Sequence, residues 1–310
     1  MAVDRNPADS GLYCGDAMMR RGPVVVTGAG GFIGRRLITA LQTAGYMVHG
    51  WRRSDVELGD AAAVSRAMAA IAPTTVFHLA SSGVLPHRQT EDCIALDEAM
   101  TANVVAAMPA GSVLVQAGSM AEYGHAGRLV ETASTVPTSL YGRAKLASTQ
   151  RAIRQGAARG LAVRVARIFG AYGPGEPAGR LIPALTDKLS RGEAVALSDG
   201  AQRRDFIHVD DACRLLIRLA AIDAGEPIIV NIGTGVAVSI RFACERIAQA
   251  LGADPGLLHF NVIQRRATDE ALLEADTSRL IALLGAAPPQ RLLDDDDDHL
   301  RALLMHGIMD

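Results

Sequence analysis

Cysteine is scarce in this chain of 310 residues, and its four copies lie far apart, at positions 14, 93, 213 and 244. They form no CxxC pair and no spacing typical of zinc ligands, so the sequence predicts neither a disulfide framework nor a metal site. Unpaired thiols of this kind are typical of proteins in a reducing compartment. We therefore expect a cytoplasmic protein.

Long apolar runs and an excess of one charge are also lacking. Because no stretch of about 18 consecutive apolar residues occurs, the sequence predicts no membrane-spanning helix. The net charge of -2 gives no electrostatic argument for nucleic-acid binding. A composition of 49% hydrophobic and 21% charged residues is that of an ordinary globular protein, long enough for one large domain or two unequal ones.

From residue 23 onward, apolar runs of strand length alternate with amphipathic stretches of helix length. Uniformly apolar strands separated by helices are typical of a parallel sheet with both faces covered. Residues 23–170 are therefore predicted to form a doubly wound α/β domain. Residues 171–310 combine loops rich in proline and glycine with short strands and helices, which predicts a smaller mixed α/β region interleaved with the sheet. Residues 1–22 are expected to be a disordered N-terminal extension.

A glycine-rich turn joins the first predicted strand, residues 24–27, to the first helix. The turn reads Gly28-Ala29-Gly30-Gly31-Phe32-Ile33-Gly34, and the order of strand, turn and helix is that of a dinucleotide-binding site. Glycine at 28 permits a tight turn, glycine at 31 lets a pyrophosphate approach the backbone, and glycine at 34 lets helix and strand pack closely. Residues 23–170 are thus predicted to be a Rossmann-type NAD(P)-binding domain.

The end of the second predicted strand lacks the acidic residue that NAD-selective folds place against the adenosine ribose. The sequence there is Gly50-Trp51-Arg52-Arg53-Ser54. Two guanidiniums suit the 2′-phosphate of NADP(H), which makes NADP(H) the favoured cofactor. The alternative is that Arg52 and Arg53 are solvated loop residues, since the 31 basic residues include only two lysines, and NAD then stays possible.

Three residues have the chemistry of a proton-transfer site. Tyr141 and Lys145 are four residues apart at the start of a predicted helix, which places the phenol and the ammonium on one face. A cation near a phenol favours its ionised form and so assists proton transfer. Tyr and Lys at this spacing also occur as exposed helix pairs. Ser119 favours catalysis, because it follows an apolar stretch and so lies at the carboxyl end of a strand, where open α/β folds assemble their sites.

Together these features resemble the short-chain dehydrogenase/reductase family, in particular its extended branch, which acts on nucleotide sugars. The resemblance covers residues 23–300 and implies that residues 171–310 form the substrate-binding region. It rests on an ordered series of motifs: TGAGGFIG (27–34), VFHLAS (76–81), GSMAEYG (118–124), YGRAK (141–145), RIFGAYGPGEP (167–177), RRDFIHVDD (203–211), NIGTG (231–235) and RATDEALLEADTSRL (266–280).

The resemblance also implies roles for single residues. Ser119 would hydrogen-bond the sugar oxygen at the reacting carbon, Tyr141 would exchange its proton with that oxygen, and Lys145 would hold the nicotinamide ribose. Arg204 and Arg266 match arginines that bind the substrate pyrophosphate, with surface ion pairs as the alternative. Cofactor contacts are expected from Gly28, Gly31, Phe32, Ile33, Gly34, Arg52, Arg53, Leu79, Ala80, Tyr141 and Lys145.

Three positions depart from the family pattern. Gly170 stands where sugar-nucleotide members often carry an asparagine that contacts substrate phosphate. Ala121 occupies the place of the acid that 4,6-dehydratases use to eliminate water, and Glu122 is displaced from it by one residue, so elimination is disfavoured. The helix expected near residues 91–108 has no asparagine at the usual place.

Acidic residues are expected to cap two helices, because carboxylates are favoured in the first turn of a helix. The run Asp294–Asp298 precedes a helical stretch near the C-terminus. Asp210 or Asp211 is expected to cap the helix predicted near 210–222.

The leading hypothesis is an enzyme that uses NADPH to reduce a nucleotide-activated 4-keto-6-deoxyhexose to the corresponding deoxysugar nucleotide. The alternative is an NAD-dependent nucleotide-sugar 4-epimerase, which uses the same residues. A non-catalytic dinucleotide-binding protein is disfavoured, because both Tyr141 and Lys145 are present. The resemblance also implies a homodimer, formed by helices near 91–108 and 140–158.

Overall fold

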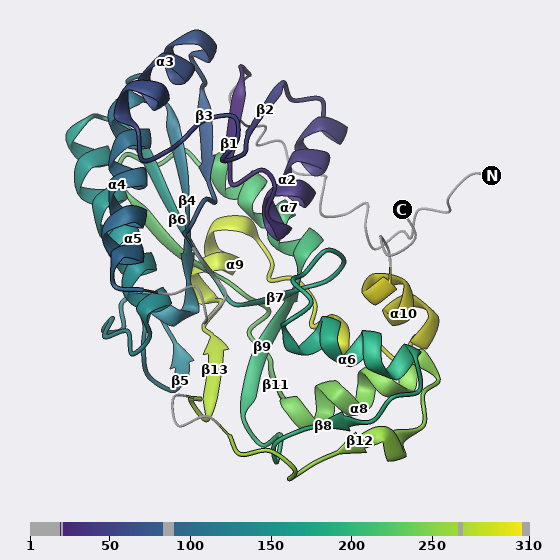
Figure 1. Ribbon diagram of the computed structural model, residues 1–310. Helices are drawn as coiled ribbons and strands as arrows, with labels where there is room; N and C mark the ends of the chain where they lie inside the picture. Colours follow the sequence, from purple (N-terminus) through teal and green to yellow (C-terminus); the bar gives the residue numbers. More distant parts are fainter. Residues whose placement is uncertain (1–18, 20, 83–89, 266–268, 306–310) are drawn as a thin grey trace.

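A parallel sheet forms the centre of the structure, a computed structural model that describes residue 19 and residues 21–82, 90–265 and 269–305 (Figure 1). Every neighbouring pair in the order β10-β6-β4-β3-β1-β2 is parallel, which confirms the predicted α/β fold. The strands are β1 (Val24–Thr27), β2 (Val48–Trp51), β3 (Thr75–His78), β4 (Val113–Ser119), β6 (Ala162–Ile168) and β10 (Ile228–Ile232).

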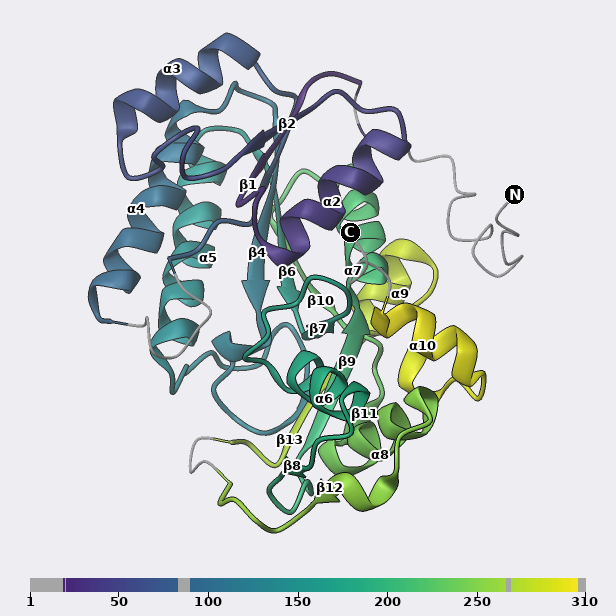
Figure 2. The ribbon, with the colours of Figure 1, turned by 45° about the vertical axis from the view of Figure 1, so that its right-hand side comes forward.

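Helices cover both faces of this sheet (Figure 2). Val25, Val76 and Leu114 point to the face covered by α3, α4 and α5, while Val24, Phe77 and Val115 point to the face covered by α2, α7 and α9. Burial on both faces explains why the strands are uniformly apolar. The helices are α2 (Phe32–Thr43), α3 (Ala61–Ile71), α4 (Asp92–Ala107), α5 (Leu140–Ala158), α7 (Val209–Ala220) and α9 (Ser278–Leu284).

The strand order reverses at β1, which has β2 on one side and β3 on the other. In open α/β sheets the crevice at such a switch point, beyond the carboxyl ends of the strands, is where ligands bind. The glycine-rich turn leaves β1 at this point. The topology therefore places the predicted dinucleotide turn where the fold offers a binding crevice.

A second region packs beneath the carboxyl edge of the central sheet (Figure 1). It has its own apolar core between helices α6, α8 and α10, and β10 from the same part of the chain forms the edge of the central sheet. Its elements are β5 (Gly127–Leu129), β7 (Gly170–Tyr172), α6 (Leu181–Ser190), β8 (Val195–Ala196), β9 (Arg203–His208), β11 (Ala237–Ser239), α8 (Ile240–Leu251), β12 (Leu258–His259), β13 (Leu272–Ala275) and α10 (Asp297–Met305). Its mixed sheet has the order β11-β9-β13-β5, and β7 also pairs with β9.

The two predicted helix caps have different outcomes. Asp296 accepts a hydrogen bond from the His299 N–H at 2.9 Å at the start of α10, which confirms the acidic run as a cap. The prediction for α7 is wrong, because His208 caps that helix by accepting from the Asp210 N–H. Asp210 instead pairs with Arg36 of α2. Arg36, which is far from Asp210 in the sequence, thus pairs with the carboxylate that the local sequence predicted as the cap.

The N-terminal extension predicted for residues 1–22 lies largely outside the described residues, but Met19 is described and is buried in the central core. Among the described residues, no helix is long and apolar enough to cross a membrane.

Candidate active site

Ser119 is the last residue of β4, a strand whose seven residues are all buried. β4 lies between β3 and β6, so the serine emerges in the middle of the carboxyl edge of the sheet. The chain then turns directly into η2 (Met120–Glu122), a single turn of 3-10 helix for which Ser119 is the N-cap. The serine is thus held by local backbone geometry on both sides.

Tyr141 and Lys145 occupy the first turns of α5, as the spacing predicts. The Lys145 Nζ lies 5.8 Å from the centre of the Tyr141 ring and donates to the carbonyl oxygen of Ala117, two residues before Ser119, at 3.2 Å. Gly142 packs so closely on η2 that a Cβ there would collide with the Ala121 carbonyl. The structure therefore brings together the serine, the tyrosine and the lysine that the sequence singled out.

The glycine-rich turn has the shape that a pyrophosphate needs. Gly28 has a φ of +70°, which favours glycine, and a Cβ at Gly34 would collide with the Gly28 carbonyl oxygen. Phe32 and Ile33 begin α2, and no side chain caps this helix. Its first N–H groups are therefore available to an anion, and the residues present fit the pyrophosphate of a dinucleotide.

The end of β3 forms the neighbouring wall of the turn, because a Cβ at Gly28 would lie 2.9 Å from the Ala80 nitrogen and 3.0 Å from the Leu79 carbonyl carbon. Asp97 of α4 holds the chain just beyond. Its buried carboxylate accepts from the Ser81 hydroxyl and the Ser82 N–H, both at 2.6 Å. Sequence reasoning missed Asp97, although an acid on the same helix face as Met100, Thr101 and Val104 was a usable signal.

The end of β2 presents two arginines to solvent. Arg52 packs near the glycine turn, since a Cβ at Gly30 would lie 3.8 Å from its Cγ. Within the described part of the chain, neither the Arg52 nor the Arg53 guanidinium has a recorded hydrogen bond or ion pair. Asp55, which sequence analysis passed over, accepts from the Arg52 N–H at 2.9 Å, and this hydrogen bond lowers the pKa of the Asp55 carboxyl. Because Asp55 contacts only the backbone of Arg52, both guanidiniums stay available to bind a ligand.

A cavity of about 210 Å³ is lined by Met120 and Ala121, which directly follow Ser119, and by Ser139, two residues before Tyr141. Arg204 lines it and donates to the backbone carbonyls of Arg203 and Glu270 at 2.8 and 2.7 Å, and its burial lowers its pKa. The neighbouring acid Asp205, a possible partner for a surface ion pair, is buried and accepts instead from the Thr234 N–H and hydroxyl. Arg266 lies outside the described residues. The cavity is lined by Met120, Ala121, Gly124, Thr138, Ser139, Arg204, Asp269, Glu270 and Leu273.

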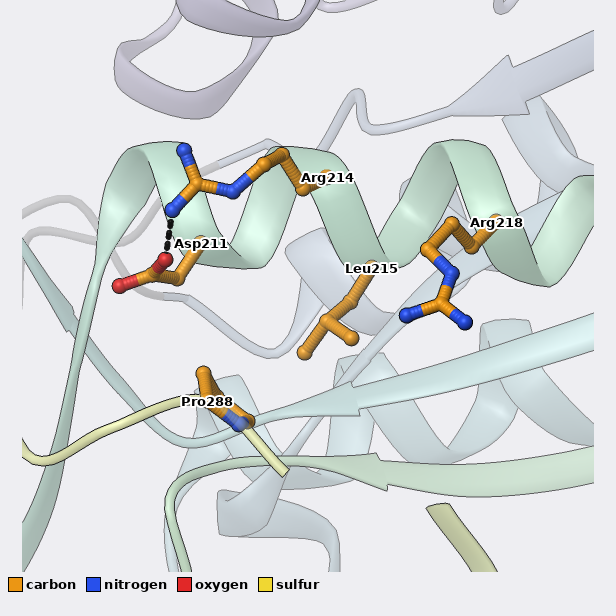
Figure 3. Close-up of a pocket in the computed structure, with 5 residues that line it drawn as sticks. All are labelled: Asp211, Arg214, Leu215, Arg218 and Pro288. Atoms are coloured by element: carbon orange, nitrogen blue, oxygen red, sulfur yellow. Dashed lines mark hydrogen bonds and ion pairs between the residues drawn. The ribbon is translucent and has the colours of Figure 1, made fainter. Parts of the chain in front are cut away.

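A second hollow, beside α7, is too small for a nucleotide (Figure 3). Asp211 and Arg214, one turn apart on α7, form an ion pair at its edge, and Leu215, Arg218 and Pro288 complete the lining. Its volume of about 10 Å³ is at the lower limit for holding a single water molecule. The cavity beside Ser119 is the better candidate for a substrate.

The two departures near the site have physical explanations. At Gly170 a Cβ would lie 2.8 Å from the Asp205 carbonyl oxygen, so the close pairing of β7 with β9 leaves no room for an asparagine. Glu122 does not line the cavity and is fully buried, with its carboxylate 3.0 Å from the Arg167 Nε. Ala121, which does line the cavity, carries no acid.

Fold and site together define a Rossmann-type enzyme with a dinucleotide turn and a Ser-Tyr-Lys set beside a cavity. Comparison with known proteins gives the family. The model of the NAD dependent epimerase/dehydratase family matches residues 24–233, so the chain belongs to this family. Together with the relatives described next, which act on nucleotide sugars, this match confirms the branch expected from the motifs.

Two curated relatives are similar over most of the chain. The dTDP-6-deoxy-L-talose 4-dehydrogenase (NAD(P)(+)) of Kitasatospora kifunensis is 29% identical over 74% of this chain and 79% of its own length. The UDP-glucose 4-epimerase of Azospirillum brasilense is 27% identical over 86% of this chain and 87% of its own length. Among solved structures, MoeE5 in complex with UDP-glucuronic acid and NAD is 29% identical, with a TM-score of 0.75 over 91% of this chain and all of the other.

Proposed function

We propose that this protein uses NADPH to reduce a nucleotide-activated 4-keto-6-deoxyhexose to the corresponding deoxysugar nucleotide. The proposal is carried by the Ser119-Tyr141-Lys145 set, which lies next to residues that line the cavity. Ala121, one of these lining residues, occupies the position at which dehydratases carry an acid. A ketone reductase needs a proton donor and a donor to the carbonyl oxygen, whereas elimination of water also needs that acid. The inward orientation of Glu122 supports reduction over elimination.

The dTDP-6-deoxy-L-talose 4-dehydrogenase supports the choice of substrate. Oxidation at C4 of a 6-deoxyhexose, which that name describes, is the reverse of the reduction of a 4-keto group. Arg204 beside the cavity supports a diphosphate in the substrate, because a guanidinium can bind phosphate oxygens with two parallel hydrogen bonds.

The free guanidiniums of Arg52 and Arg53 support NADPH as the reductant, since Arg52 lies beside the glycine turn and both follow β2 directly, where they could bind a 2′-phosphate. When bound, NADPH supplies the hydride for C4. Tyr141 then donates a proton to O4, so that the ketone gains the two hydrogens of an alcohol. Ser119 donates a hydrogen bond to O4 and orients it, while Lys145 favours the phenolate that remains on Tyr141.

The test is a screen of the purified protein for NADPH consumption with 4-keto-6-deoxyhexoses activated by dTDP, UDP or GDP. We expect turnover with one of them, and no dependence on added metal. Tyr141→Phe keeps the ring and removes the proton, and should lower kcat by roughly 10²- to 10⁴-fold. Binding of NADPH to the same variant is the control and should change little. Absence of turnover with every substrate, or full activity of Tyr141→Phe, would refute the proposal.

A nucleotide-sugar 4-epimerase is the second candidate, favoured by the similarity to the Azospirillum brasilense UDP-glucose 4-epimerase over most of both chains. An epimerase oxidises and then reduces the same substrate, so it retains its cofactor through turnover. Mass spectrometry of the dinucleotide released from denatured protein separates the two functions. Stoichiometric NAD would support the epimerase, and an empty or loosely loaded site would support the reductase.

A further inference from the structure

We propose that Glu122 is a positioning residue, whose buried carboxylate fixes Ser119 in the orientation needed to donate to the substrate oxygen. The role rests on the proposed function, but it applies equally to any hydride transfer that uses Ser119. Glu122 is fully buried and makes three hydrogen bonds. Oε1 accepts from the Ser119 N–H at 2.9 Å and from the Thr149 hydroxyl at 3.0 Å, while Oε2 accepts from the Arg167 Nε at 3.0 Å.

The contact with Ser119 governs what its hydroxyl can do. The Ser119 Oγ accepts from the Ala121 N–H at 3.2 Å, while the Glu122 side chain holds the Ser119 N–H, so the two residues form a reciprocal capping box. A hydroxyl has one hydrogen to donate, and here its oxygen already acts as an acceptor. The O–H of Ser119 is thereby left to donate to the carbonyl oxygen of a substrate.

The contact with Thr149 connects the serine to the other two catalytic candidates. Thr149 lies on α5, four residues after Lys145 and eight after Tyr141, so all three side chains share one face of the helix. One carboxylate oxygen therefore holds both the end of β4 and the helix that carries Tyr141 and Lys145. It fixes the serine relative to the proton donor.

The surroundings of Glu122 leave room for its carboxylate and supply a charged partner. A Cβ at Gly118 would lie 2.6 Å from Oε1, so glycine there leaves the room that the carboxylate needs. On the other side, burial works against the charge of Arg167, but Glu122 and Tyr123 outweigh it and raise the Arg167 pKa. Arg167 also lies 4.6 Å from the centre of the Tyr123 ring and donates to the Glu131 carbonyl at 3.2 Å. Glu131 belongs to the loop that continues to Thr138 and Ser139 in the cavity wall.

Two double variants separate positioning from ion pairing. Glu122→Gln with Arg167→Met keeps an acceptor at residue 122, and Glu122→Met with Arg167→Met removes it, while neither leaves a buried charge unpaired. With the substrate identified by the NADPH screen, the Gln variant should keep kcat within about threefold of wild type and the Met variant should lose at least tenfold, with KM changed less than kcat. In a Ser119→Ala background the Met variant should add less than about twofold, because its effect passes through the serine.

Equal kcat values in the two double variants, or independent losses in the Ser119→Ala background, would overturn the role of Glu122 without touching the proposed function. Absence of wild-type turnover would instead refute the proposed function. In that case amide hydrogen exchange still decides the matter for Glu122. A peptide that contains residues 118–123 should exchange at least tenfold faster in the Met variant than in the Gln variant, and equal exchange would refute the proposal.

Discussion

Buried ionisable side chains set how this protein responds to pH at the residue scale. His78 is enclosed between the Thr27 hydroxyl, 2.7 Å from its Nδ1, and the Thr101 hydroxyl, 3.2 Å from its Nε2. Burial, with a smaller contribution from the Lys145 charge, lowers its pKa to about 3. The ring is thus neutral near pH 7 and connects the strand before the glycine turn to α4 through hydrogen bonds. These two hydrogen bonds explain why a polar side chain is tolerated at the buried end of β3.

Glu176 gives the clearest prediction for pH dependence. Burial raises its pKa to about 7 from 4.5, against the opposing effects of the Arg180 charge and a hydrogen bond with the Gly173 backbone. Between these two pH values the folded state holds a proton that the unfolded state has released, so stability falls as pH rises through this window. Glu176→Gln should therefore match wild type at about pH 4 and exceed it by up to about 3 kcal/mol at about pH 8, measured by urea unfolding. A constant difference between the two pH values would contradict this, and the exposed variant Glu226→Gln serves as control.

Arg52 gives a prediction for cofactor choice. If its guanidinium binds the 2′-phosphate, Arg52→Ala should weaken NADPH binding at least tenfold, or about 1.4 kcal/mol, and NADH binding much less. Fluorescence titration with both dinucleotides measures the two effects. Arg66→Ala, an exposed arginine on α3, should leave both affinities unchanged. Equal losses for NADPH and NADH in the Arg52 variant would argue against the phosphate contact.

At the scale of elements, the junction between β1 and α2 is the most tightly constrained part of the site. Gly34→Ala should lower the free energy of unfolding by about 2–4 kcal/mol and weaken dinucleotide binding, because the added methyl group would collide with the Gly28 carbonyl. Thermal unfolding and NADPH titration measure the two effects. Gly225→Ala is a suitable control, since nothing lies within 4 Å of the added Cβ. A fully stable Gly34 variant that still binds NADPH would show that the turn can relax.

The elements themselves were largely predictable, and their polar contacts were not. Apolar runs and helical spacing are local properties, so β1, α4, α5 and α7 fall where the sequence places them. The predicted cap of α7 was wrong, because Asp210 pairs with Arg36 on another helix and His208 caps α7 instead. Asp97 was missed for the same kind of reason, since its partners Ser81 and Ser82 belong to the loop after β3. Contacts between segments distant in sequence are invisible to local patterns.

At the scale of the whole molecule, we propose a homodimer formed through α4 and α5. The solvent-facing side of α4 carries small apolar residues, including Ala95 and Ala99, and Leu96 is 40% exposed. A symmetric pair would bury the same stripe on both subunits. Sedimentation velocity should give a dimer for wild type and a monomer for Leu96→Arg. Ile281→Arg, at an equally exposed position on α9, should remain dimeric, and a monomeric wild type would refute the proposal.

The sequence by itself determined the parallel α/β architecture and the glycine-rich turn after β1. It also determined that a serine ends a strand and that a tyrosine and a lysine lie one turn apart at the start of a helix. These depend on residue spacing within single strands and helices, which the chain carries locally. Only the tertiary structure decided which way Glu122 faces, because its partners Thr149 and Arg167 come from α5 and β6. A carboxylate one residue away from a catalytic position became a buried support for Ser119, since burial requires hydrogen-bond partners and only packing supplies them.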